Sequence, residues 1–432
     1  MPQDKVLLIS CYFPPAGGIQ VQRALSLARY LPENGFQVFV LTARASVPNK
    51  DPELMKMIPE GVQVHRTWTL EPPFGLRKKL WSRVNPASSS GRATTGFVGK
   101  VKSLLAGKVK QLLCPDPQVL WYPFAMRRAS KLIRDNGIQT VIVTAPPFSG
   151  FLLLNELKRR FPQIRTIADI RDEWLRYYVK EFVFRDATDI ASRAAEIERQ
   201  TVESCDRVVA VTETSLKEVR SRYPDQPKGK FVLIPNGYDP ACFSQFRSRP
   251  RQPGKIVVTY TGTLYKPCSP KPYLDALDAL PDLCHGFETR FVGRIAEEFD
   301  RGVFENRKSL VRLLDFVPQK EVISLMQESD VLLLPWADRF NIPGKLFEYL
   351  ATGKPILALC YSDSDVERVI RETSSGWCVL PDDPGAIERA LREIYASQGN
   401  YPKARDWEAV GRYQRPRLVA SYAKTIRECA VS

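Results

Sequence analysis

The segment 341–359, NIPGKLFEYLATGKPILAL, brings a glycine, a lysine and a carboxylate close together in the chain. Pro343 and Gly344 are typical of the first two positions of a helix, where backbone N–H groups lack partners and the helix dipole favours an anion. Lys345 adds a positive charge there, and Glu348 falls one turn further along, near the helix start. A carboxylate at that place can accept hydrogen bonds from both hydroxyls of a ribose. The segment predicts a helix start that binds phosphate and sugar; the alternative is a helix with two solvated charges.

Three further strand ends in the second half carry glycine, hydroxyl or basic residues. They are KIVVTYTG with the following TLYK, then ETRFVG with the following arginine, and finally LLDFV. Glycine lets the backbone approach a ligand, while hydroxyl and cationic groups bind phosphate oxygens. The predicted binding residues at these ends are Gly262, Thr263, Lys266, Arg294 and Val317. Because the carboxyl ends of parallel strands share one edge of a sheet, their convergence favours a nucleoside diphosphate site.

The first half has two candidate sites at strand ends. Gly17 and Gly18 follow the first strand and precede a helix, so they can approach a phosphate or simply make a tight turn. They are not part of a GxGxxG motif, which weakens the case for a dinucleotide cofactor. In ADIRDEW, Asp172 follows another strand and can accept a sugar hydroxyl or support charge at a reacting carbon. The alternative is a structural ion pair between Arg171 and Asp172.

Strand-like and helix-like segments alternate along the chain, a pattern typical of doubly wound parallel sheets. The stretch RSRPRQPG at 247–254 has the composition of a linker, and the alternation restarts after it. We therefore predict an α/β protein with two Rossmann-like domains, residues 1–246 and 247–405. The C-terminal segment 406–432 contains helical spacing and is expected to pack back on the first domain.

The composition of the 432 residues is that of a globular protein that can bury a sizeable core. Nine cysteines without a CxxC pair favour reduced thiols, and two histidines make a zinc site improbable. No apolar run reaches the roughly 18 residues of a spanning helix. We expect a cytoplasmic protein that contains no metal.

The net charge of +15 is concentrated in one segment, since residues 75–134 hold thirteen basic side chains and a single acid, Asp116. Within it, the apolar residues of 97–112 follow helical spacing, with most lysines on the other side. A basic amphipathic helix favours an anionic membrane surface, which would place the protein on the inner face of the membrane. The alternative is a solvated helix face docked on the core. Nucleic acid is not indicated, because no recognised binding motif accompanies the charge.

The order of motifs resembles that of the retaining GT-B glycosyltransferases grouped as family four, over nearly the whole chain. The similar stretches are PPAGGIQVQR, VLIPNGYDPACF and PGKLFEYLATGKP. The resemblance implies that Gly18 faces the donor diphosphate, Lys345 contacts phosphate and Glu348 holds the ribose. It also implies an N-terminal acceptor domain, a C-terminal donor domain and a front-face reaction without a bound metal.

Three positions depart from the family pattern. Phe340 stands where the family has a first glutamate, Thr263 stands where it has an arginine, and Asp172 lies near the place of a missing histidine. The expected function is transfer of a sugar from a nucleoside diphosphate donor to a hydroxyl of a glycan or lipid-linked acceptor, with Asp172 and Lys345 as catalytic residues. A non-catalytic nucleotide-sugar-binding protein and a sugar-nucleotide 2-epimerase of the same fold remain alternatives.

Overall fold

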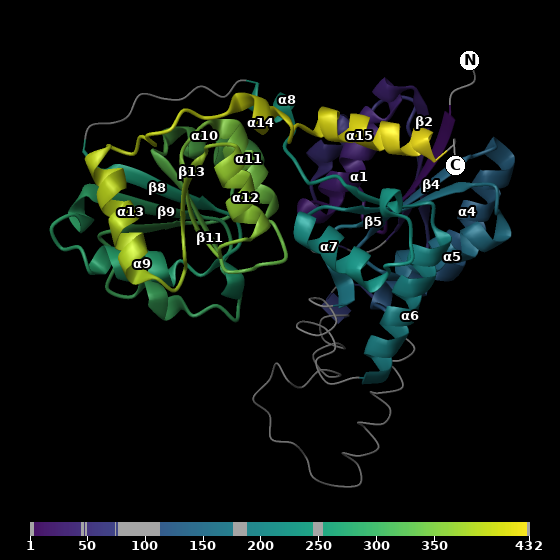
Figure 1. Cartoon of the computed structure of the whole chain (residues 1–432), viewed down its shortest axis with the longest axis horizontal. Helices are drawn as coiled ribbons and strands as arrows, with labels where there is room; N and C mark the ends of the chain where they lie inside the picture. The colour runs from purple at the N-terminus through teal and green to yellow at the C-terminus, as the bar shows by residue number, and fades with distance from the viewer. Residues whose placement is uncertain are drawn as a thin grey trace, which may run out of the picture. The chain divides into compact units, whose positions relative to one another are not determined.

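The computed structural model describes residues 4–44, 47, 50–73, 75–76, 113–175, 188–244 and 254–429. The chain forms two compact units (Figure 1). Unit 1 comprises Met1–Ile234 and Val419–Ser432, and unit 2 comprises Pro235–Leu418. The predicted amphipathic helix at 97–112 and most of the predicted linker lie outside the described residues.

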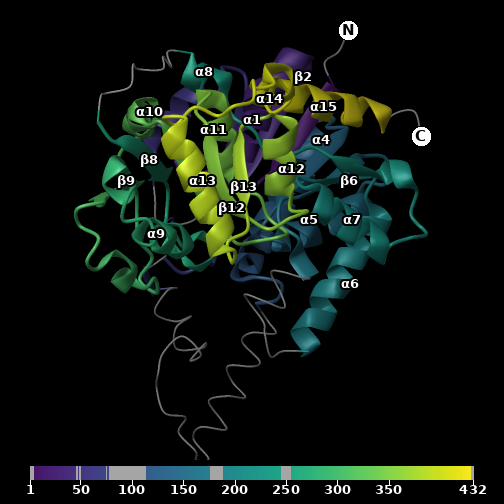
Figure 2. The ribbon, with the colours of Figure 1, turned by 60° about the vertical axis from the view of Figure 1, so that its left-hand side comes forward.

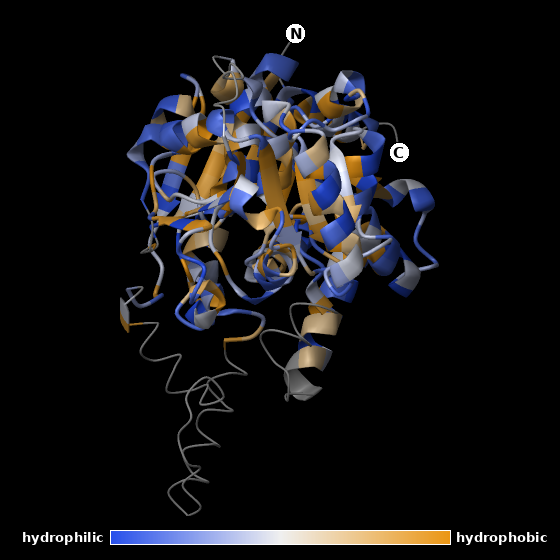
Figure 3. Ribbon diagram, turned by 90° about the vertical axis from the view of Figure 1, so that its left-hand side faces the viewer, coloured by the Kyte–Doolittle hydropathy of each residue, from blue (hydrophilic) through white to orange (hydrophobic). Residues whose placement is uncertain are grey.

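Unit 1 is built on a seven-stranded sheet in the order β3-β2-β1-β4-β5-β6-β7, in which every pair is parallel. The central strands are nearly continuous apolar runs, because parallel strands covered by helices are buried on both faces. Figure 3, in which unit 2 faces the viewer, shows the same arrangement for the sheet of that unit: hydrophobic strands among more hydrophilic helices. The strands are β1 (Asp4–Ile9), β2 (Phe36–Ala43), β3 (Gln63–Thr67), β4 (Thr140–Ala145), β5 (Arg165–Ile170), β6 (Arg207–Ala210) and β7 (Phe231–Leu233).

The helices of unit 1 cover this sheet, and α4, α5 and α6 pack against one another in chain order. The C-terminal helix α15 lies alongside α1 (Figure 1). The helices are α1 (Ile19–Tyr30), α4 (Tyr122–Asn136), α5 (Ser149–Arg160), α6 (Thr188–Ser204), α7 (Glu213–Arg222) and α15 (Arg415–Glu428), and α15 enters unit 1 at Val419.

Unit 2 is built on a six-stranded parallel sheet in the order β10-β9-β8-β11-β12-β13. Its strands are β8 (Ile256–Thr261), β9 (Phe287–Val292), β10 (Val311–Leu314), β11 (Val331–Trp336), β12 (Ile356–Cys360) and β13 (Gly376–Val379). Its helices are α8 (Pro240–Phe243), α9 (Lys271–Asp278), α10 (Gln319–Glu328), α11 (Gly344–Thr352), α12 (Asp365–Glu372), α13 (Pro384–Ala396) and α14 (Trp407–Gly411). Helix α13 packs against α9 (Figure 2). The two sheets confirm the predicted pair of doubly wound α/β folds.

The unit boundaries fall at residues 234 and 418, where the sequence suggested 246 and 405. The reason is apolar packing, since Tyr238, Val410 and Tyr413 are buried in the core of unit 2. The backbone N–H of Tyr238 also donates to the carbonyl of Tyr413 at 3.0 Å. The segments on either side of the predicted boundaries therefore fold together as part of unit 2.

Each sheet has one place where the direction of winding reverses. In unit 2, β8 has β9 on one side and β11 on the other, and in unit 1, β1 has β2 on one side and β4 on the other. In open α/β sheets, ligands bind at such switch points, outside the carboxyl ends of the strands. The expected ligand-binding loops are therefore those that follow β8 and β11 in unit 2, and β1 and β4 in unit 1.

Candidate functional site

Two glycines at the switch point of unit 2 have positive φ angles and close neighbours that disfavour any larger residue. Gly262 follows β8 with a φ of 118°, and Gly293 follows β9 with a φ of 135°. A Cβ at Gly293 would lie 2.4 Å from the carbonyl oxygen of Gly262, so no larger residue fits there. Close packing between the ends of β8 and β9 therefore requires a glycine at position 293.

Helix α11 begins one residue later than predicted. Pro343 is the N-cap in an extended conformation, and Gly344 is the first helical residue. The first backbone N–H groups of α11 lack partners within the helix. They lie after β11, which pairs with β8 in the sheet. Lys345 is the second residue of this helix, so it lies beside the loop that follows β8.

Lys345 is half-buried and its ammonium group has a defined partner. Its Nζ donates a hydrogen bond to the hydroxyl of Tyr260 and lies 3.9 Å from the centroid of that ring. A Cβ at Gly262 would lie 2.8 Å from the same Nζ. Burial lowers the pKa of Lys345 to about 8, opposed by Cys268 and Glu348, which raise it. Lys345 is therefore a half-buried lysine whose ammonium group is held against the end of β8.

Glu348 lies one turn into α11 and is also half-buried. Burial raises the pKa of its carboxyl group, while the charges of Arg415 and Lys345 lower it. Arg415 comes from the start of α15, where its Nε donates to the carbonyl of Gly237 at 3.1 Å. Two cations therefore act electrostatically on Glu348, and sequence spacing could not reveal the contribution of Arg415.

The loop between β11 and α11 is fixed by its own polar groups. The carboxylate of Asp338 accepts from the backbone N–H groups of Phe340 at 2.8 Å and Asn341 at 3.2 Å. The indole Nε1 of Trp336 donates to the carbonyl of Asn341 at 2.7 Å. Asp338 is the carboxylate nearest in sequence to Phe340. Both of its oxygens accept hydrogen bonds from residues of the loop itself.

The remaining predicted residues of unit 2 follow β8, β9 and β10 on the same edge of the sheet. Thr263 and Lys266 are exposed, and the carbonyl of Thr263 accepts from the hydroxyl of Tyr260 at 2.7 Å. Arg294 is exposed, with its guanidinium 4.9 Å from the ring centroid of Phe316. Val317 is half-buried. The predicted donor-binding residues of unit 2 therefore lie at strand ends on one edge, as expected; their roles stay predictions.

Gly18 and Asp172 belong to unit 1. Gly18 is exposed, has a φ of 92° and is the N-cap of α1, where an added Cβ meets no heavy atom within 4 Å. Gly17 is the crowded one, because its Cβ would lie 3.2 Å from the Cβ of Asp51. The double glycine thus serves a backbone turn as well as leaving Gly18 open at the strand end.

Arg171 connects the end of β5 to the end of β4 and the start of α1 in unit 1. Its guanidinium donates to the carbonyl oxygens of Gln20 at 2.8 Å, Ala145 at 3.3 Å and Pro146 at 2.5 Å. These carbonyls belong to the start of α1 and the exit of β4, while Arg171 itself follows β5. Arg171 is therefore a structural brace between loops, a role that the sequence did not predict.

The two residues after Asp172 anchor the same loop in the core. Glu173 is fully buried and forms an ion pair with Arg222 of α7. The Trp174 indole stacks on Phe148, with ring centroids 4.4 Å apart and an interplanar angle of 4°. Asp172, which is half-buried, is held between a braced arginine and two anchored neighbours.

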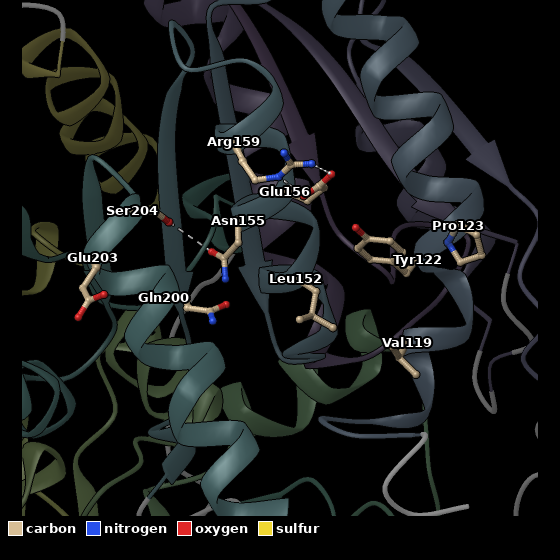
Figure 4. A pocket seen from close by; sticks show the side chains of 10 residues that line it. All are labelled: Val119, Tyr122, Pro123, Leu152, Asn155, Glu156, Arg159, Gln200, Glu203 and Ser204. Atoms are coloured by element: carbon tan, nitrogen blue, oxygen red, sulfur yellow. Dashed lines mark hydrogen bonds and ion pairs between the residues drawn. The ribbon is translucent and has the colours of Figure 1, made fainter.

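A pocket of about 730 Å³ lies elsewhere in unit 1, between α4, α5 and α6 (Figure 4). Its lining is Val119, Tyr122, Pro123, Leu152, Asn155, Glu156, Arg159, Gln200, Glu203 and Ser204. Glu156 and Arg159 pair with each other across one helical turn at 2.7 Å. None of the residues predicted for chemistry lines this pocket, so we regard it as a groove between surface helices.

The described residues contain neither a cluster of metal ligands nor a membrane-spanning helix. No group of three or more His, Cys, Asp or Glu side chains there is arranged to hold a metal ion. No helix among them is long and apolar enough to cross a membrane.

Comparison with protein families identifies both halves of the chain. Residues 95–241 match Glycosyltransferase Family 4, and residues 255–397 match Glycosyl transferases group 1. Each half of the chain therefore matches a model of glycosyltransferases, and its two-domain fold is of the GT-B class.

Individual relatives are distant. The chain is 25% identical over 166 residues to the probable glycosyltransferase WbjE of Pseudomonas aeruginosa, a match covering 37% of this chain and 42% of WbjE. The matches span less than half the length of the curated relatives. The fold is similar to sucrose-phosphate synthase from Thermosynechococcus elongatus, with a TM-score of 0.64 and 14% identity over the whole of both chains. It is also similar to HepE from Anabaena in complex with UDP, with a TM-score of 0.61 and 11% identity over 98% of this chain and all of HepE.

Proposed function

We propose that this protein transfers a sugar from a nucleoside diphosphate sugar to a hydroxyl group of a glycan or lipid-linked acceptor. The observation that carries the proposal is the cation of Lys345 at the start of α11, beside Gly262 at the switch point of unit 2. The helix start, the lysine and the open strand end suit a diphosphate, and Glu348 one turn further on suits a ribose. In this proposal unit 2 binds the donor and unit 1 binds the acceptor.

The chemistry requires stabilisation of the leaving diphosphate. Lys345, Lys266 and the N–H groups of α11 supply positive charge and hydrogen-bond donors where negative charge develops. Gly18 adds an open backbone position, and Asp172 supports charge at the reacting carbon or orients the acceptor hydroxyl. The family resemblance supports a retaining, front-face reaction without a bound metal. Uridine diphosphate is the first donor nucleotide to test, because the similar fold of HepE is known in complex with UDP.

The proposal is tested by incubating the protein with a panel of nucleoside diphosphate sugars and measuring thermal stabilisation, nucleotide release and sugar isomerisation. A transferase is stabilised by one donor and releases its nucleotide slowly to water and faster to an acceptor. A non-catalytic binding protein is stabilised without release, and an epimerase isomerises the sugar without an acceptor. No stabilisation by any donor contradicts a nucleotide-sugar site.

Lys345→Ala tests the residue that carries the proposal. We expect turnover to fall by about two orders of magnitude or more, the range for a lost electrostatic donor. Lys320→Ala is the control, because Lys320 is an exposed lysine on α10. Near-normal turnover of Lys345→Ala would remove the role assigned to Lys345.

We further propose a peripheral association with an anionic membrane surface, which would bring the protein to lipid-linked acceptors of polysaccharide biosynthesis on the inner face of the membrane. The support is the positive charge of residues 75–134. Flotation with anionic and neutral vesicles at low and high salt tests it. Binding to anionic vesicles that weakens with salt is expected, and no binding at low salt contradicts it.

A further inference from the structure

We propose that Tyr260 is the positioning residue of the donor site: its ring and hydroxyl hold the ammonium of Lys345 at the end of β8, where the diphosphate is to bind. The inference rests on the proposed function for the role of Lys345. The contact between the two side chains is a feature of unit 2 that stands independently of it.

Tyr260 is suited to this task because its ring is buried and packed against a neighbouring strand. The residue lies in β8 and is fully buried. Phe291 of the neighbouring strand packs against the ring, with centroids 6.1 Å apart. An aromatic face attracts a cation, and more strongly when the cation is partly withdrawn from water, as the half-buried Lys345 is. The flexible four-carbon stem of Lys345 is thereby fixed at its charged end.

The hydroxyl of Tyr260 is oriented by a second hydrogen bond. It donates its only proton to the carbonyl of Thr263 at 2.7 Å, which leaves a lone pair to accept from Nζ of Lys345. Two consecutive hydrogen bonds therefore connect Lys345, through the hydroxyl of Tyr260, to the carbonyl of Thr263 in the loop after β8. An ammonium group has three donors, so two remain for phosphate oxygens.

The contacts of Lys345 with Tyr260 stabilise its charged form, which burial disfavours. Burial lowers the pKa of Lys345 to about 8, and the groups that raise it are Cys268, which is buried in the loop after β8, and Glu348 on α11 itself. The tyrosine contributes a hydrogen-bond acceptor and the negative face of its ring, both of which favour the ammonium form. Loss of the hydroxyl should release the proton of Lys345 at a lower pH.

The test compares Tyr260→Phe with Tyr349→Phe. Tyr349 is the matched control, since its ring is fully buried on α11 and its hydroxyl accepts from the N–H of Thr261 at 2.8 Å. Both variants lose a buried hydroxyl, but only the first loses the acceptor of Lys345. The titration of Lys345 is followed by NMR of its ¹³Cε group, assigned with the Lys345→Arg variant.

We expect the Lys345 titration midpoint to fall by about one pH unit in Tyr260→Phe and to stay unchanged in Tyr349→Phe. UDP binding should weaken as pH rises through about 8 in the wild-type protein and at lower pH in Tyr260→Phe. At pH 8 that variant should bind UDP up to about tenfold more weakly, and lower pH should restore most of the affinity. A general loss of structure would not move the pH profile in this way.

The proposal is overturned if Lys345 titrates alike in the wild type and Tyr260→Phe, or if both phenylalanine variants shift it equally. It is also overturned if the wild-type protein shows no nuclear Overhauser effect between the Tyr260 ring and the ε protons of Lys345, a measurement that needs no variant. If the wild type binds no nucleotide, the proposed function fails while the titration still reports on Tyr260.

Discussion

An added Cβ at Gly262 would lie 2.8 Å from Nζ of Lys345 and 3.2 Å from its Cε. The two residues follow neighbouring strands, β8 and β11, and meet at the switch point of unit 2. The glycine thus leaves room for the lysine as well as for a ligand. Even a methyl group there should displace the cation from Tyr260.

Gly262→Ala is therefore expected to weaken nucleotide binding by about tenfold or more. The matched control is Gly254→Ala, because Gly254 has a similar φ of 130° but no heavy atom within 4 Å of its Cβ position. Both variants carry the strain of a non-glycine residue at positive φ, of the order of 1–3 kcal/mol. Calorimetric titration with UDP and thermal melts separate the two effects. Equal affinity in both variants would contradict the steric argument.

Glu348→Gln should weaken nucleotide binding without lowering the stability of the fold. Burial raises the pKa of Glu348, so its ionised form is disfavoured in the folded protein. The stability linked to its protonated form is present below the ordinary pKa of 4.5 and is lost as pH rises through the raised value. Glutamine carries no such charge, so we expect an unchanged or higher Tm near pH 7. Nucleotide affinity should fall by about 10- to 100-fold, the effect of one lost charged hydrogen bond.

The control for this variant is Glu408→Gln, whose side chain is 86% exposed in unit 2. It should change neither Tm nor nucleotide affinity. A Glu348→Gln protein that binds UDP as tightly as the wild type would remove the ribose contact from the proposal. Binding across a series of nucleotides with and without the ribose hydroxyls would locate the contact.

The fold could be predicted because its signals are local. Buried parallel strands such as β12 are apolar runs, and the glycines at 262 and 293 mark where the loops after β8 and β9 begin. The boundaries at 234 and 418 could not be predicted, since they depend on Tyr238 meeting Tyr413 from distant parts of the chain. No local pattern encodes that contact.

The residues of the candidate site likewise fall into those that the sequence could predict and those that it could not. Residues that follow strand ends, such as Gly262 and Lys345, could be chosen because parallel strands deliver their carboxyl ends to one edge. Tyr260 and Arg415 were missed, since their contacts depend on the sheet order and on where α15 begins. The sequence did hold one signal for Tyr260. It lies two residues before Gly262, and side chains two residues apart in extended backbone point to the same face, so Tyr260 could have been placed on the same face as the predicted glycine. The role of Arg171 as a brace likewise depends on carbonyls of two other loops.

Asp172→Asn and Trp174→Ala are expected to have opposite consequences. Asp172 is half-buried, and the proposed function gives its carboxylate a role in the reaction, so its loss should lower turnover with little change in Tm. Trp174 stacks on Phe148 in the core, so its truncation should cost about 3–5 kcal/mol of the free energy of unfolding. Denaturant unfolding and turnover are measured on both variants. Normal turnover in Asp172→Asn would reduce Asp172 to a structural residue.

Asp169 holds the C-terminal helix to the sheet of unit 1. It lies fully buried in β5, pairs with Arg23 of α1 at 2.9 Å and accepts from the hydroxyl of Tyr422 on α15. Burial alone would raise the pKa of Asp169, but Arg23 and Tyr422 outweigh burial and lower it. The stability from this carboxylate is therefore present above its ordinary pKa of 3.8 and is lost as pH falls through the lowered value.

Asp169→Asn should accordingly cost about 3–5 kcal/mol near pH 7, because it leaves the buried Arg23 charge without its partner. Tyr422→Phe should cost about 1–3 kcal/mol, and the control Glu196→Gln, from a half-exposed ion pair with Arg199, less than about 1 kcal/mol. Denaturant unfolding from pH 7 to pH 3 measures all three. The difference between wild type and Asp169→Asn should shrink at the acid end, because below about pH 3.8 the carboxylate of the unfolded wild-type chain takes up a proton and the charge-dependent stability begins to be lost. A difference that stays constant with pH would mean that Asp169 stabilises unit 1 by packing rather than by charge.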